Sequence, residues 1–322
     1  MLIKYQLQRQ LLINQEKNRE VLLYFFDIIK IGDNMNSLIS INHKFMDVNP
    51  KKLVELINET KYVKGVEANI NIDSPYELKY LDDLVFELKK NNLILQIHGD
   101  IEFDISKQLD YFKKLETYSD YLNMPIILTL HTIYDEDSSI SLQKTADYIS
   151  TIINNVNKEK IVVCLENLND IRGYVRLGKD EIRNIILNDE DLYFTYDIGH
   201  ELYDRGNITS LDEYVIEDIR NVHIHSNDNI SRDHIPIHKN DIHWNDIMKA
   251  LEYLISINYK YNIVYEYNLY WCKGDTIEEE IIDYLDSIDL VSEKYGKWGD
   301  FVWLFFVQFI TFLVIYKLFH KS

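Results

Sequence analysis

Residues 193–200 read YFTYDIGH, a short apolar run that ends in two metal-type ligands, Asp197 and His200. Other parts of the chain repeat this design, in which a run of Ile, Val, Leu and Tyr leads directly to a His or Glu. These runs are LILQIHGD (93–100), LTLHT (128–132), VVCLEN (162–167), VHIHSND (222–228) and IVYEYN (263–268). Such compositions predict strands that are covered on both faces.

The ligand-type residues recur at a steady interval along the chain. The spacing is 33, 35, 31, 28 and 41 residues along the series His98, His131, Glu166, Asp197, His225 and Glu266. A strand followed by a return helix occupies roughly 30 residues or more. Because the carboxyl ends of successive parallel strands meet at one rim, we expect these carboxylates and imidazoles to reach one point in space.

The whole pattern predicts one large α/β domain. Strand candidates lie at 38–45, 65–71, 93–98, 126–131, 161–166, 192–197, 221–226 and 262–267. Helical patterns lie between them and after them, at 50–60, 75–91, 105–123, 141–157, 180–188, 212–219, 245–258 and 276–294. Eight strand–helix units in about 258 residues predict a (β/α)₈ TIM barrel over residues 35–295. The alternative is an open doubly wound sheet, which would gather its ligands near one switch point instead of spreading them over the third to eighth strands.

Composition limits the partners. Of 322 residues, 46% are hydrophobic and 27% are charged, which suits a folded chain with a substantial core. The formal net charge of −19 repels a phosphate backbone and attracts cations, so it argues against a duplex nucleic acid partner. The two cysteines, Cys164 and Cys272, belong to no C-x-x-C pair and are expected to be ordinary reduced thiols. We expect no organic cofactor.

The two ends depart from the repeating pattern. Residues 1–34 form an N-terminal extension whose apolar stretch has no small-residue cleavage site, so we expect a packed helix or a start at Met35, not a signal peptide. Residues 301–316 contain 14 apolar residues. The segment 299–319 is long enough, at about 1.5 Å per residue, to approach a hydrocarbon core of roughly 30 Å. It predicts a single-pass C-terminal membrane anchor with the barrel in the cytoplasm; the alternative is a helix buried on the barrel or in a homodimer.

The clustered ligand types predict a divalent metal site. Three buried carboxylates at close range cannot all stay ionised without cations between them. Mixed carboxylate and imidazole ligands suit Zn, Mn or Co better than Ca. In the D-I-G-H run, Gly199 is expected to make a sharp turn that lets both ligands face the site.

Further histidines surround the seventh strand. His223 and His225 share one strand face; His225 is the expected ligand, whereas His223 is assigned to a supporting or core position. Of the histidines in the following loop, His234 is expected in the site and His238 and His243 are expected outside it.

Taken together, these motifs resemble the xylose-isomerase-like TIM-barrel superfamily, which holds sugar isomerases and epimerases together with endonuclease IV, that is, AP endonuclease family 2. The resemblance covers about residues 36–290. It rests on D-x-x-H at 197–200, H-x-N-D at 225–228, H-x-P-x-x-x-x-D-I-x-W at 234–244 and the strand Glu at 266. The metal quartet of this superfamily maps onto Glu166, Asp197, His225 and Glu266.

The endonuclease branch implies further ligands. Its histidines on the third and fourth strands map to His98 and His131, and its third metal site would use His200 and His234. Two positions depart from that branch. Arg232 stands where it has Asp, although Asp233 is adjacent, and His238 stands where it has Gly.

Two mechanisms follow from the resemblance. In a sugar or sugar-phosphate isomerase or epimerase, the quartet would hold one metal against a carbonyl and its neighbouring hydroxyl. Glu166 and Glu266 would exchange a proton with carbon, and His200 would orient a substrate oxygen. In a zinc phosphodiesterase, His98 and His131 would complete a second metal bridged by Glu166, and two or three metals would activate water against a phosphoester. We favour the isomerase for substrate class; a third alternative is a non-catalytic binding module.

Overall fold

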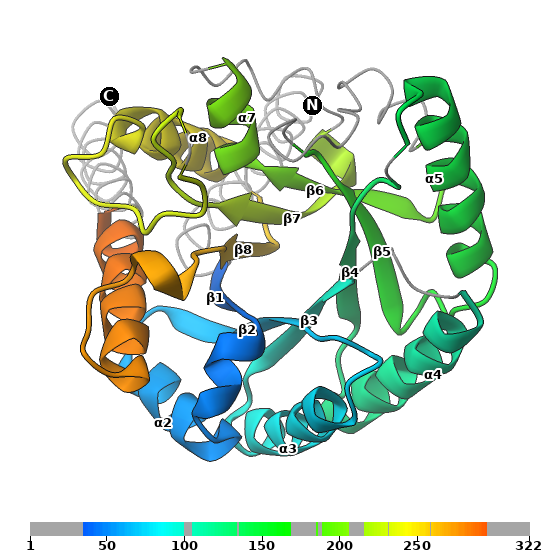
Figure 1. Ribbon diagram of the computed structural model, residues 1–322, viewed down its shortest axis with the longest axis horizontal. Coiled ribbons are helices and arrows are strands. Elements are labelled where there is room, and N and C mark those ends of the chain that lie inside the picture. Colours follow the sequence, from blue (N-terminus) through cyan, green and yellow to red (C-terminus); the bar gives the residue numbers. More distant parts are fainter. Residues whose placement is uncertain are drawn as a thin grey trace, which may run out of the picture.

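The computed structural model describes residues 35–99, 105–133, 135–168, 185, 189–205, 216–230, 232–257 and 259–294. Within this part of the chain, parallel strands β1 to β8 pair in sequence order and close into a barrel (Figure 1). The strands are β1 (Asn36–Ile41), β2 (Val63–Asn69), β3 (Ile94–Gly99), β4 (Ile126–Leu130), β5 (Ile161–Glu166), β6 (Leu192–Asp197), β7 (Ile219–Ile224) and β8 (Asn262–Tyr265). The predicted TIM barrel is therefore confirmed.

Helices follow the strands around the outside of the barrel. They are α2 (Pro50–Glu59), α3 (Pro75–Asn91), α4 (Ile105–Leu122), α5 (Ser138–Ile153), α7 (Ile198–Arg205), α8 (Trp244–Ser256) and a helix over residues 277–294. Figure 1 shows α2, α3, α4 and α5 succeeding one another around the strands. Local sequence explains two of the starts, because Asn49 and Ser74 accept backbone N–H bonds at the helix N-termini and a proline follows each of them.

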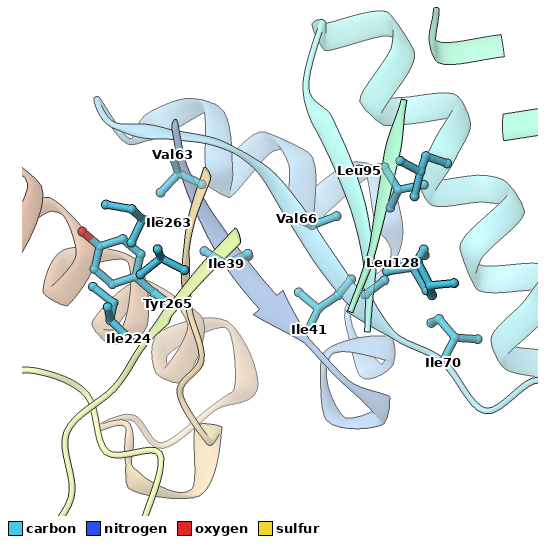
Figure 2. Close-up of a cluster of buried hydrophobic side chains, with 14 of the residues drawn as sticks. Ile39, Ile41, Val63, Val66, Ile70, Leu95, Leu128, Ile224, Ile263 and Tyr265 are labelled. Carbon is cyan, nitrogen blue, oxygen red and sulfur yellow. The ribbon is translucent and has the colours of Figure 1, made fainter. Parts of the chain in front are cut away.

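Alternate residues of each strand face opposite ways, and the two faces differ in chemistry. The apolar face packs against the helices and includes Ile39, Val66, Leu95 and Ile263 (Figure 2). The opposite face, inside the barrel, carries fully buried polar side chains, including Glu67, Thr129, Thr195 and Asn221. The interior of this barrel is therefore polar in its middle as well as at its rim. In most TIM barrels branched apolar residues dominate the interior.

The last helix closes the barrel. The Tyr284 hydroxyl accepts the backbone N–H of Ser40, at the end of β1, at 3.2 Å and that of Tyr267, just after β8, at 3.1 Å. It also bonds the carbonyl of Tyr265. The closure of β1 on β8, with Asn36 paired to Asn262, is thereby fixed by a side chain from outside the sheet.

Several predicted boundaries were wrong. The first strand ends at Ile41, not at residue 45, because Asn42 caps a 3₁₀ helix over His43–Asp47. The helix predicted over 212–219 does not extend to residue 219, because residues 216–218 form a 3₁₀ helix and Ile219 belongs to β7.

Three predictions fall mainly beyond the described residues: the extension 1–34, the anchor 299–319 and the helix 180–188, of which only Ile185 is described. Among the helices that the structure describes, none is both long and apolar enough to cross a bilayer.

Candidate metal centre

All eight predicted ligands meet at the carboxyl rim of the barrel. They come from β3, the end of β4, β5, β6, α7 and the segments after β7 and β8: His98, His131, Glu166, Asp197, His200, His225, His234 and Glu266. Except for His131, these residues form three groups together with His223, and within each group the potential ligand atoms all lie within 4.8 Å of one another. The groups are His98–Glu166–His223–Glu266, Glu166–Asp197–His200 and His200–His225–His234. The convergence expected from the spacing of the strands is present.

Glu166 lies at the middle of the cluster. Its Oε2 is 3.2 Å from His98 Nε2 and 3.2 Å from His131 Nε2, while its Oε1 is 3.4 Å from His200 Nδ1. The His98 and His131 rings meet edge to face at 4.5 Å. A single carboxylate therefore links the histidines of β3 and β4 to the rest of the site.

A second set of contacts surrounds Asp197. Its Oδ1 lies 3.3 Å from His225 Nε2, and its Oδ2 lies 3.4 Å from His200 Nδ1. On the other side of the His225 ring, Nδ1 lies 3.2 Å from Asp233 Oδ1. This sequence of carboxylate and imidazole directs Nε2 of His225 into the site, as outer carboxylates do for metal-binding histidines.

His234 reaches the site from the loop after β7. Its backbone has a φ of 55°, and its ring stacks on that of His225 at 4.1 Å and 13°. Its Nε2 is 3.6 Å from Glu266 Oε2. Arg232 pairs with Asp228 at 2.7 Å, whereas the adjacent Asp233 faces the His225 ring.

Gly199 works differently from the prediction. Residues 198–205 form α7, so the chain enters a helix immediately after Asp197 instead of making a glycine turn. A Cβ built on Gly199 would lie 2.3 Å from both Cε1 and Nε2 of His225. The position therefore needs glycine because the His225 ring packs directly against the backbone.

Asn167 supports the rim through hydrogen bonds to Asp197 and His200. Asn167 donates through Nδ2 to the Asp197 carbonyl at 2.9 Å and accepts the Asp197 N–H at 2.7 Å. Its own carbonyl lies 2.9 Å from His200 Nδ1 and accepts a hydrogen bond from it in the Nδ1–H tautomer. His243 lies outside the site as predicted, with Nε2 between the side-chain oxygens of Asn227 and Asn229 at 3.1 and 3.0 Å. His238 belongs to none of the ligand groups among the described residues.

The buried polar atoms at the rim fit a cation. Among the described residues, six of these atoms have no hydrogen-bond partner: His98 Nδ1, Glu166 Oε1, Asp197 Oδ2, His223 Nδ1, His225 Nε2 and Glu266 Oε2. Buried polar atoms are normally hydrogen-bonded, so convergent exceptions need an explanation. Oxygen and imidazole nitrogen together are the ligand set of Zn, Mn or Co.

The carboxylates and imidazoles of the cluster shift one another's pKa values. Burial lowers the pKa of His98, but hydrogen bonding to Glu166 and nearby carboxylates raise it to about 9. Burial also lowers the pKa of His225, but the carboxylates of Asp197 and Asp233 raise it to about 10. Burial favours neutral Glu166, yet the surrounding imidazoles hold its pKa well below the usual value. Without metal, protons on histidine therefore serve as the countercharge.

Exposure separates the inner part of the site from its mouth. The side chains of Glu166, Asp197, His223 and His225 are fully buried. The His131 side chain is 30% exposed, and those of His234 and Glu266 are each 17% exposed. A substrate can therefore approach between the ends of β4 and β8.

Sequence reasoning placed His223 outside the ligand set. Its Nδ1 lies 3.1 Å from Glu266 Oε2 and 3.4 Å from Glu166 Oε1, as close to the carboxylates as the predicted ligands. The two-residue offset from His225 put both rings on the inner face, which was the available signal. No such signal marked Asn167, because its supporting role depends on hydrogen bonds to Asp197 on the next strand.

Comparisons with known proteins agree with this fold. The profile of the family described as xylose isomerase-like TIM barrel matches residues 54–288. A xylose isomerase domain protein from Alicyclobacillus acidocaldarius superposes with a TM-score of 0.60 and 14% identity, over 83% of this chain and 99% of that chain. No curated protein sequence matches the chain.

Two epimerase structures are also similar. 3-Keto-D-glucoside 4-epimerase from E. coli gives a TM-score of 0.58 with 15% identity, over 80% of this chain and 98% of that one. D-Psicose 3-epimerase from Clostridium cellulolyticum H10 gives 0.57 with 13% identity, over 82% and 99%. At these identities the likeness establishes the fold alone.

Proposed function

Because the chain belongs to the xylose isomerase-like TIM-barrel family, we propose that it is a divalent-metal-dependent isomerase or epimerase of sugars or sugar phosphates. The observation that carries the proposal is the placement of two carboxylates, Glu166 and Glu266, on either side of one buried imidazole nitrogen at the rim. The epimerase activities named for the similar structures support the substrate class.

In this proposal the chain itself performs the proton transfers. Glu266 is partly exposed at the mouth and Glu166 is buried, and these two carboxylates would act as the base and the acid toward a substrate carbon that binds at the mouth. His200, whose Nδ1–H is bonded to the Asn167 carbonyl, offers Nε2 to a substrate oxygen. A divalent cation held by Glu166, Asp197, His225 and Glu266 supplies Lewis-acid charge that polarises a carbonyl.

Solvent exchange tests this proposal directly. Metal-loaded protein is incubated in D₂O with ketohexoses and their phosphates, and NMR follows deuterium incorporation next to the carbonyl. We expect exchange that the Glu266→Gln variant loses, while Glu55→Gln, an exposed change on α2, retains it. Full exchange by Glu266→Gln would refute the assignment of the site.

A zinc phosphodiesterase is the second candidate. Its specific support is the pair His98 and His131, both 3.2 Å from Glu166 Oε2, because a one-metal isomerase does not need them. Two-metal sites use such bridging carboxylates in phosphoester hydrolysis. Metal analysis of the purified protein separates the two functions: one metal per chain supports the isomerase, and two or three, largely zinc, support the hydrolase. The net charge of −19 favours a small phosphoester over a duplex nucleic acid.

We also propose that residues 299–319 anchor the barrel to a membrane with the barrel in the cytoplasm. The support is the apolar run of 14 residues within 301–316. Deletion of residues 299–322 should move the protein from the membrane fraction to the soluble fraction. An unchanged membrane fraction contradicts the anchor, and a dimer that dissociates on deletion would show that the segment is an interface.

A further inference from the structure

A charged side chain lies inside the barrel beneath the metal centre. Glu67 on β2 is fully buried, and its Oε1 and Oε2 lie 3.0 and 3.2 Å from Nε2 of His223. The other nitrogen of that ring, Nδ1, is the atom that lies 3.1 Å from Glu266 and 3.4 Å from Glu166. One imidazole therefore separates a carboxylate in the middle of the barrel from two carboxylates at its rim.

The position of Glu67 is fixed by polar neighbours from across the barrel. Asn221 on β7 donates through Nδ2 to Glu67 Oε2 at 3.0 Å and to the Thr129 hydroxyl at 3.2 Å. Thr129 in turn shares a hydrogen bond of 2.9 Å with Thr195. Strands β2, β4, β6 and β7 thus join in one buried polar layer, which leaves the Glu67 carboxylate little freedom to turn.

The His223 ring cannot be explained as ordinary core packing. Its side chain is fully buried, and both nitrogens face carboxylates. Nδ1 has no hydrogen bond of good geometry among the described residues, although two rim carboxylates lie within 3.4 Å. Nε2 lies 3.2 Å from Glu67 Oε2 and 3.0 Å from Asn221 Nδ2, and Nδ1 is aimed at the point where Glu166 and Glu266 meet. Carboxylates that orient an imidazole in this way tune metal sites, and their loss typically lowers metal affinity about 10–100-fold.

We propose that Glu67 and His223 are positioning residues that set the geometry of Glu166 and Glu266 at the cation. Glu67 acts through His223, and His223 acts on the two rim glutamates. The proposal rests on the function proposed above only in requiring that a divalent cation binds there. It adds a functional pair that lies below the ligands and outside the set predicted from the strand ends.

Cobalt binding tests the proposal without measuring turnover. Metal-free protein is titrated with Co²⁺, and the visible d–d spectrum and the dissociation constant are recorded. Glu67→Gln keeps the size of the side chain and an oxygen acceptor but removes the charge. We expect it to bind Co²⁺ about 10–100-fold more weakly and with a shifted spectrum. Thr195→Val is the matched control, because it removes a hydrogen bond from the same buried layer without touching His223. It should lower the melting temperature while keeping the wild-type spectrum and affinity.

A double substitution tests whether Glu67 works through His223. His223→Asn places an amide near the former Nδ1 and removes the contact with Glu67. In the His223→Asn background, Glu67→Gln should therefore weaken Co²⁺ binding by less than about threefold further. A wild-type spectrum and affinity in Glu67→Gln, or fully additive losses, would overturn the proposal. If wild-type protein binds no Co²⁺, Zn²⁺ or Mn²⁺, the proposed function itself fails, which is a different result.

Discussion

The close packing of Gly199 on His225 gives the sharpest prediction. A Cβ at position 199 would lie 2.3 Å from two atoms of an imidazole that is fully buried, so the ring cannot move aside freely. Overpacking of this kind costs about 1–3 kcal/mol. Gly199 is also a helical residue of α7, where alanine is intrinsically better than glycine by about 1 kcal/mol.

These two effects can be separated in a double-mutant cycle. Gly199→Ala should destabilise the metal-free wild-type protein by up to about 2 kcal/mol, because the gain in helix propensity offsets part of the clash. In a His225→Ala background the three closest atoms are gone, and the same change should stabilise by up to about 1 kcal/mol. The helix propensity is the same in both backgrounds, so the expected coupling is the clash alone, about 1–3 kcal/mol.

Urea unfolding in the presence of a chelator measures both steps. Metal titration provides a second measurement, because a displaced His225 ring should also weaken cation binding. If Gly199→Ala cost the same stability in both backgrounds, the clash with His225 would be refuted, and the backbone conformation would be the reason for the glycine.

Three further predictions concern protons, the rim and the barrel seam. At pH 7.5, His98 and His225 each hold a proton, because their pKa values are raised to about 9 and about 10. A cation held by Glu166, Asp197, His225 and Glu266 must displace the proton of His225, so calorimetry in two buffers should detect about one proton released, and about two if a second cation also binds His98. The raised pKa values of the two histidines stabilise the metal-free protein fully below about pH 6.5, and this contribution is lost as the pH rises through about 9 and 10; a melting temperature that is flat over that range would contradict the assignment. Asn167→Ala should lower metal affinity about 10–100-fold, because Asp197 loses its two hydrogen bonds to Asn167. Equal affinities of the variant and the wild-type protein in a metal titration would contradict this role. Tyr284→Phe should cost about 1–3 kcal/mol in urea unfolding by leaving buried backbone N–H groups unpaired, whereas Tyr76→Phe, on an exposed ring, should cost less.

Much of the fold could be predicted because the strand ends carry the chemistry. The strands over 161–166 and 192–197 were predicted to the residue, since each is an apolar run that a ligand terminates. Boundaries failed where a polar residue begins a new turn. Asn42 starts a 3₁₀ helix inside a run that still alternates, and residues 216–219 have a helical composition but enter β7.

The supporting part of the site was harder to predict. Glu67 lies in VKGVEAN, where a single acidic residue is indistinguishable from a solvent-exposed one until the barrel closes around it. Its partner His223 is 156 residues away, so no local pattern could join them. Gly199 was recognised as necessary, but for the wrong reason, because the ring that it accommodates comes from the next strand.

The parallel pairing of the first strand with the last has a consequence for biosynthesis. Asn36 and Asn262 bond side chain to side chain across 226 residues of sequence. At about 5–20 residues per second, a ribosome needs about 10–45 s to make the chain between them. Throughout that interval the free edge of β1 is a template for wrong association, and Glu266 has not yet been made. The proposed cation site is therefore complete only once translation has passed the eighth strand.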